Sequence, residues 1–291
     1  MREISTQQKS MGFLKGFELS QLRRILRGYP VFHVGLFDYF SSRKRLLVFL
    51  FLQLLPLLAI GLDRNEYRYL PVWVFGNNFV TYTFTYYINV ILVIETIFFA
   101  LSITRDEIDR ETISYWINTP IYRFEIILWK YVAYVCFSCL MFFPPTIILF
   151  ALQGHALAVS CSAGSTCLES VLPFLINALL IEFIAIILYG AIFFLFAIIF
   201  SRPLLPALLV AFIDVFFSNT PFAGVFGSFS PAYHLRSITY QLQLVRRGTA
   251  VVHLITGYDN PSSPFSIVYI TTICLFLAIF FFRRKDLHHQ V

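Results

Sequence analysis

Charged residues are scarce in this chain. Only 13% of its 291 residues are Asp, Glu, Lys or Arg, 58% are hydrophobic, and the mean hydropathy is +0.74. Soluble domains carry about a quarter charged residues, so this composition excludes one and predicts an integral membrane protein. The period-2 alternation of a membrane β-barrel is also missing, because IILYGAIFFLFAIIF (186–200) is apolar on every side. The predicted fold class is therefore all-α.

Enzyme signatures are absent as well. The sequence contains no G-x-x-x-x-G-K-[ST] with which to hydrolyse ATP, no H-E-x-x-H and no G-x-S-x-G. None of the six histidines falls within a long apolar window, and the basic residues lack the aromatic interleaving of a nucleic-acid surface. We therefore expect no catalytic residue, metal site or bound cofactor on this chain, and no nucleic-acid partner.

Cysteines are few. Three of the five lie in apolar windows, where a thiol packs as a small apolar group: Cys136, Cys139 and Cys274. The other two, Cys161 and Cys167, fall in a short Gly/Ser-containing connection, 153–170. An oxidising compartment would permit a disulfide between them, and two free thiols are the alternative.

Long apolar windows are what the chain has in abundance. About 20 apolar residues cross a bilayer core, and six windows predict six transmembrane helices: 46–62, 79–103, 125–152, 171–200, 203–218 and 265–282. The domains predicted from them are a leader (1–45), a six-span domain (46–282) and a basic tail (283–291).

The basic residues predict the orientation. Seventeen of the 22 Lys and Arg residues fall in the leader, the loop after the second window with the start of the third window, the turn at Arg202 and the tail. Basic loops stay in the cytoplasm. We therefore expect a multi-pass protein of the plasma membrane with both termini cytoplasmic.

The leader carries an amphipathic pattern. Between residues 13 and 40, apolar residues recur at helical spacing with Arg23, Arg24 and Arg27 among them, until Gly28 and Pro30 interrupt the pattern. This predicts a helix lying at the membrane interface, whose basic face meets either anionic lipid or a protein partner.

The segment RDEIDRETISYWINTPIYRFEIILWK (105–130) combines charge with helical periodicity. Its four acids and two bases at 105–111 predict a loop in water. Ile113, Trp116 and Ile117 then recur at helical steps before Pro120, and a further helix is expected from Arg123. This predicts a short interfacial helix that binds a soluble partner; the alternative is a solvated loop with a snorkelling helix end.

Three further features concern the connections. Residues 219–264 are too apolar for a solvated linker and predict two short re-entrant helices in the outer leaflet. Pro144 and Pro145 predict a bend in the third window. The short turn at 201–202 predicts that the fourth and fifth windows are antiparallel neighbours.

Three carboxylates fall inside apolar windows, with no Lys or Arg expected in the hydrocarbon core to pair with them: Glu95, Glu182 and Asp214. An ionised group there costs about 2.5–3.5 kcal/mol. Glu95, Asp214 and the amide of Asn89 either line a substrate path or form hydrogen bonds between helices. Glu182 is expected to pack.

The chain resembles the permease subunits of type-2 (type V fold) ABC exporters. The family pattern runs from an acidic stretch through G-T-L, a short helix, S/T-P and R-x-E-I to a Lys. The matching residues are Glu107 to Glu111, Thr112, Ile113, Ser114 to Asn118, Thr119, Pro120, Arg123, Glu125, Ile126 and Lys130. Phe282 to Leu287 is similar to the family's closing F-x-R-R-D-L, whereas the family's glycine before Thr is Glu111 here.

The resemblance implies a transport complex. Two such permeases, identical or paralogous, would each dock on a separate cytoplasmic P-loop ATPase that binds ATP and Mg²⁺, and would export a hydrophobic or amphipathic substrate. It implies a coupling loop (104–124) whose ATPase contacts are Asp106, Glu107, Arg110, Glu111, Thr112, Ser114, Tyr115, Trp116, Asn118, Pro120 and Arg123. It also implies that the second and fifth spans line the path, which favours Asn89, Glu95 and Asp214 as path residues.

Two other functions remain open. A membrane protein that moves no substrate would transmit ATPase motion to a partner at 219–264. An intramembrane enzyme would use Asp214 and Glu182 as an acid–base pair, which the absence of an accompanying nucleophile or metal site disfavours.

Overall fold

The part of the chain that can be placed is helical. The computed structural model describes residues 29–41, 43–62, 79, 83–109, 121–160, 166–219, 230–241 and 263–284, and no strand occurs among them. The all-α prediction is confirmed for these residues. The helices are α2 (Tyr29–Ser41), α3 (Arg43–Leu62), the π-helix η2 (Thr83–Leu92), α5 (Val93–Asp109), α7 (Arg123–Ser160), α8 (Thr166–Ile199), α9 (Leu204–Asn219), α11 (Pro231–Gln241) and α13 (Ser263–Arg284).

Each predicted apolar window is helical over most of its length. Three described helices contain stretches long and apolar enough to cross a membrane: Arg123–Leu152, Leu172–Ile199 and Ser263–Arg284. Shorter apolar helices cover Tyr87–Ser102 and Leu204–Val215. The chain is therefore a membrane-embedded protein.

Prolines mark where several helices begin. Pro30, Pro231 and Pro264 lie in the first turns of α2, α11 and α13, and Pro203 immediately precedes α9. The first turn tolerates proline because its N–H groups have no intrahelical acceptor. In contrast, Pro144 and Pro145, where the sequence predicts a bend, lie inside α7, which continues through them as one helix.

Helices extend into two of the predicted connections. The charged segment from 104 begins as helix, because α5 continues to Asp109. In the 153–170 connection, α7 continues to Ser160 and α8 begins at Thr166, and 161–165 lie outside the described residues. Both loop predictions were wrong over those stretches. The reason is that loss of apolar character marks where a helix leaves hydrocarbon, whereas the helix itself can continue into water.

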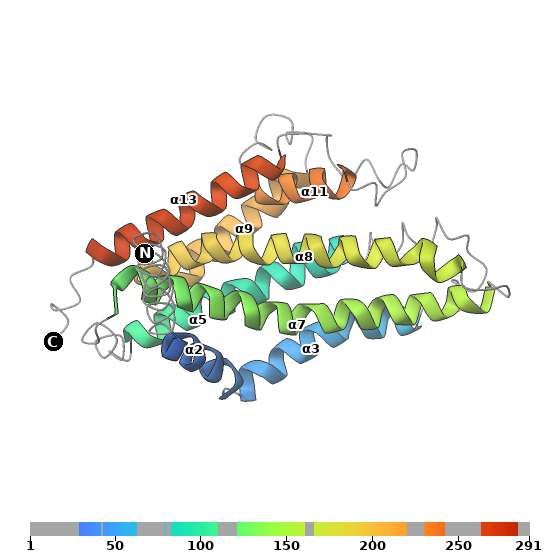
Figure 1. Ribbon diagram of the computed structural model, residues 1–291, viewed down its shortest axis with the longest axis horizontal. Coiled ribbons are helices and arrows are strands. Elements are labelled where there is room, and N and C mark those ends of the chain that lie inside the picture. The colour runs from blue at the N-terminus through green and yellow to red at the C-terminus, as the bar shows by residue number, and fades with distance from the viewer. Residues whose placement is uncertain are drawn as a thin grey trace, which may run out of the picture.

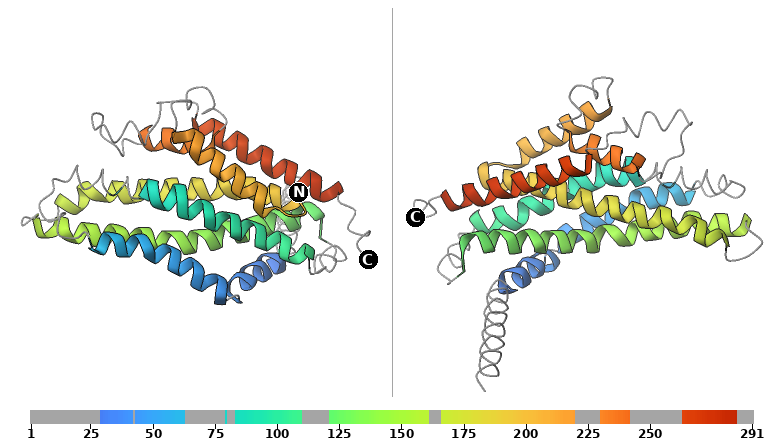
Figure 2. Two further views of the ribbon diagram at one scale, coloured as in Figure 1. Left: turned by 180° about the vertical axis from the view of Figure 1, so that it is seen from behind. Right: turned by 45° about the horizontal axis from the view of Figure 1, so that its top comes forward.

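Helix α8 lies at the centre of the bundle. It packs against α5, α7 and α13, and α9 returns beside α5 after the turn at 200–203 (Figure 1). Figure 2 shows α2 against one end of α7, and α11 beside α13 and α9. The first described helix and the C-terminal end of α13 lie at the same end of the bundle (Figure 1).

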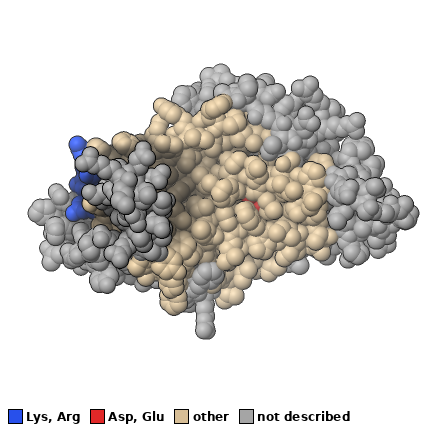
Figure 3. Space-filling view, viewed as in Figure 1, with Lys and Arg blue, Asp and Glu red and all other residues tan. Residues whose placement is uncertain are grey.

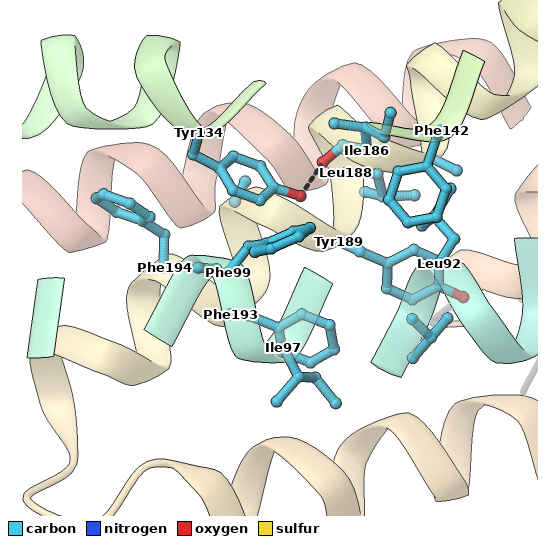
Figure 4. Packing of buried hydrophobic residues seen from close by; sticks show 14 of the residues in the cluster. Leu92, Ile97, Phe99, Tyr134, Phe142, Ile186, Leu188, Tyr189, Phe193 and Phe194 are labelled. Atoms are coloured by element: carbon cyan, nitrogen blue, oxygen red, sulfur yellow. Dashed lines mark hydrogen bonds between the residues drawn. The ribbon is translucent and has the colours of Figure 1, made fainter. Parts of the chain in front are cut away.

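The contact between α7 and α8 is especially close. The hydroxyl of Tyr134 on α7 donates to the backbone oxygen of Ile186 on α8 at 3.1 Å (Figure 4). A Cβ added to Gly190, one turn further along α8, would lie 2.2 Å from Cε1 of Tyr134. Tyr134 is fully buried, so its ring has little room to move away. The helices can therefore approach only because residue 190 lacks a side chain.

We predict that Gly190→Ala lowers the free energy of unfolding by about 1–3 kcal/mol, the usual cost of overpacking a core. Thermal unfolding of the purified protein in detergent measures it. The same substitution in a Tyr134→Leu background should cost less, because the colliding ring atoms are gone. An equal cost in both backgrounds would contradict the proposed contact.

Candidate functional site

One end of the bundle carries the helices that flank the predicted partner-binding segment. Helix α2 packs against the start of α7, where Val31 and Ile126 are both buried, and the rings of Phe32 and Trp129 meet edge to face at 6.1 Å. The second stretch of the predicted leader is thus docked on the helix that follows the predicted partner-binding segment. Residues 1–28 lie outside the described residues.

The same end is basic. The guanidinium of Arg123, in the first turn of α7, donates to the backbone oxygen of Arg283 at 3.3 Å and so joins α7 to the end of α13. Arg202, Arg283 and Arg284 are exposed. On the face drawn in Figure 3, the described Lys and Arg residues gather at this end, and the described middle of the molecule is almost uncharged. The charge distribution separates a polar end from an apolar band.

Most of the predicted partner-binding residues fall on 110–120, outside the described residues. Asp106 and Glu107 lie in the last turns of α5. The structure therefore describes the residues that flank this segment: α5 ends at Asp109, the description resumes at Ile121, and Arg123 begins α7. Cys161 also lies outside the described residues, and the side chain of Cys167 is not described, so the predicted disulfide is not tested.

The predicted path residue Glu95 lies in a buried hydrogen-bonded group of three helices. Nε2 of Gln53 on α3 donates to Oε2 of Glu95 at 3.0 Å, and the hydroxyl of Tyr87 on η2 donates to the backbone oxygen of Gln53 at 3.2 Å. Glu95 has no exposed surface, and its Oε1 has no hydrogen-bond partner among the described residues. The group joins α3, η2 and α5.

Asn89 lies on η2, two residues after Tyr87. It is 9% exposed, and its Oδ1 has no hydrogen-bond partner among the described residues. π-Helices are rare and often occur at functional sites. Oδ1 of Asn89 and Oε1 of Glu95 are thus two buried oxygens that accept no hydrogen bond from the described residues.

Glu182 packs, as predicted. It is fully buried on α8 and accepts a hydrogen bond from the hydroxyl of Thr146 on α7. Asp214 bonds to other partners, on α8 and near α11. The described hydrogen bonds thus do not link Glu182 to Asp214.

Asp214 lies at a junction of three elements. The hydroxyl of Tyr189 on α8 donates to its Oδ2 at 2.7 Å, and the hydroxyl of Ser230 donates to its Oδ1. The backbone N–H of Ala232 on α11 is 3.3 and 3.4 Å from the two oxygens. Tyr189 lies ten residues before the end of α8 at Ile199, and Asp214 lies ten residues after the start of α9 at Leu204, about 15 Å along each helix. This contact therefore confirms that the fourth and fifth windows are antiparallel neighbours.

A buried cation accompanies Asp214, contrary to the sequence prediction. Arg236 of α11 is 2% exposed and interacts electrostatically with Asp214. The sequence predicts that Arg236 lies in the outer connection 219–264, because no apolar window contains it. Packing of α11 onto α8, α9 and α13 brings it inside. Of the two short helices predicted at 219–264, α11 is described, and 242–262 lie outside the described residues.

Sequence reasoning also missed Ser230 and Tyr189. Ser230 has a readable signal, since Ser-Pro at 230–231 is a typical helix start and Ser230 Oγ accepts from the N–H of Tyr233 at 3.2 Å. Tyr189 has no local signal, because it lies in an unbroken apolar run. Its role depends on α9 folding back onto α8.

Comparison with known proteins does not assign the chain: no family model, no curated protein and no solved structure matches it.

We predict that Gln53→Leu destabilises the protein by about 1–3 kcal/mol, because it leaves the buried carboxylate of Glu95 without its described donor. The double variant Gln53→Leu/Glu95→Leu should be more stable than Gln53→Leu, since donor and acceptor are then removed together. Thermal unfolding in detergent compares them. A double variant less stable than the single one would show that Glu95 has a second partner that matters more than Gln53.

Proposed function

We propose that this chain is the transmembrane permease subunit of an ABC transporter, which exports a hydrophobic or amphipathic substrate with energy from a separate cytoplasmic ATPase. In this proposal α3, η2 with α5, α7, α8, α9 and α13 are the six spans. Two such subunits, identical or paralogous, enclose the path, and the end that carries α2 faces the cytoplasm of a cell whose plasma membrane holds the complex.

The packing of α2 on the start of α7 carries this proposal. A partner that pushes on residues 110–120 would act on a short segment held between α5 and α7. The contacts of Ile126 with Val31 and of Trp129 with Phe32 join α7 to α2, and the bond from Arg123 joins it to α13. A push there would therefore move several helices together, as transmission of ATPase motion requires.

The basic end supports the proposed orientation. Arg123 bonds to Arg283 at the end of α13, next to Arg284, and the described Lys and Arg residues visible in Figure 3 gather at one end of the bundle. Cytoplasmic ends of membrane proteins are enriched in Lys and Arg. An anionic membrane surface or an acidic partner would both favour this end of the bundle.

Purification of the tagged chain from its host in mild detergent, with mass spectrometry of the proteins that stay bound, tests the proposal. We expect a P-loop ATPase in stoichiometric amount. A folded, monodisperse chain that retains no ATPase after gentle crosslinking would contradict it.

We predict that Glu111→Lys weakens association with that ATPase about tenfold or more, because like charges would then face each other in the docking groove. Stimulated ATP hydrolysis should fall with it. The matched control is Glu169→Lys, the same change near the start of α8, at the opposite end of that helix from the turn at 200–203. Wild-type association and hydrolysis in Glu111→Lys would count against this docking segment.

A further inference from the structure

The carboxylate of Asp214 is surrounded by donors from other helices. Tyr189 Oη is 2.7 Å from Oδ2, Ser230 Oγ donates to Oδ1, and the Ala232 nitrogen lies 3.3 and 3.4 Å from the two oxygens. Asp214 itself is 6% exposed. Both of its oxygens accept hydrogen bonds here, as those of an ionised carboxylate do.

Two of the donors, Ser230 and the N–H of Ala232, lie at the N-terminus of α11. Ser230 immediately precedes α11, its hydroxyl accepts from the N–H of Tyr233 at 3.2 Å, and the same hydroxyl donates onward to Asp214. The first N–H groups of a helix lack intrahelical acceptors and carry a partial positive charge. Here the carboxylate of Asp214 on α9 accepts from the N–H of Ala232 and offsets the partial positive charge, as a bound anion does at a helix N-terminus.

Arg236 adds a full positive charge to this arrangement. It follows Ala232 by four residues, so the two lie on the same face of α11, one turn apart. Arg236 is almost completely buried, and its charge interacts with Asp214. A buried cation needs a nearby anion, because removing it from water unpaired is costly.

We propose that Tyr189, Ser230, the N-terminus of α11 and Arg236 form a binding site for a carboxylate anion, which the chain fills with its own Asp214. The bound carboxylate tethers α11 to the α8–α9 hairpin. This inference goes beyond the proposed function and does not depend on it, because it concerns contacts within the single chain.

The tether decides which helices move as one body. Asp214 belongs to α9, Tyr189 to α8, and the remaining donors to α11 or the residue before it. Another polar contact of α11 is to α13, where His234 Nδ1 and Ser263 Oγ are 3.2 Å apart. Loss of the carboxylate should therefore release the first turn of α11 from α8 and α9 and leave the rest of the bundle folded.

Hydrogen–deuterium exchange of the purified chain in detergent tests the proposal without any ATPase. In Asp214→Ala we expect the amides of 231–241 to exchange about tenfold faster or more, equivalent to about 1.4 kcal/mol of lost local protection. Amides of α7 between 126 and 150 are the internal control and should exchange as in the wild type.

Added formate distinguishes an anion site from ordinary packing. Formate is the carboxylate that the truncation to Ala removes, so it should slow exchange in 231–241 toward the wild-type rate, and chloride at equal ionic strength should not. Asp214→Asn is the matched control. Its amide fills the same space and turns an N–H₂ toward the donors, so exchange should be fast and formate should have no effect.

Three results would overturn the proposal. These are wild-type exchange of 231–241 in Asp214→Ala, equal acceleration of α7 and α11, or an equal response of the Ala and Asn variants to formate. If Asp214→Ala does not fold, Tyr189→Phe and Ser230→Ala take its place, since each removes one donor and keeps the carboxylate. Each should then accelerate exchange in 231–241 severalfold, and unchanged exchange in both would contradict the site.

Discussion

The rest of this apolar bundle depends on hydrogen bonds between polar side chains and groups on neighbouring helices. In hydrocarbon no water replaces a missing hydrogen bond. The central helix α8 accepts such bonds from α7: the hydroxyls of Tyr131 and Tyr134 on α7 donate to the backbone oxygens of Ile187 and Ile186 at 2.7 and 3.1 Å. Because these bonds need exact spacing, they fix how far apart α7 and α8 lie, and Gly190 makes that spacing possible.

The three buried acids also form hydrogen bonds between helices. Glu182 ties α8 to α7, Glu95 ties α5 to α3, and Asp214 ties α9 to α8 and α11. Each acid lies between helices of the same chain. In this conformation they hold helices together, and a path role would require the helices that carry them to separate.

The two ends of the bundle differ in what they join. At the basic end, apolar contacts and the Arg123 bond connect α2, α7 and α13. Toward the other end, the carboxylate of Asp214 connects α11 to the α8–α9 hairpin. Tyr189 lies ten residues before the end of α8 at Ile199, about 15 Å at 1.5 Å per residue, so one continuous stretch of α8 joins the Asp214 contact to the turn that carries Arg202. In the proposed function, this stretch of α8 would carry motion from the basic end to the Asp214 contact.

The sequence by itself determined the helical class, the membrane character and the approximate position of each apolar helix, because these follow from local hydropathy and from prolines at helix starts such as Pro30 and Pro203. It also identified the buried acids, since a charge in an apolar run is visible without a fold. Only the tertiary structure decided their partners. Tyr189 and Arg236 come to Asp214 from 25 and 22 residues away in the chain, and Gln53 comes to Glu95 from 42 residues away. Local pattern cannot encode such pairings, because they depend on which helix faces pack together and how closely.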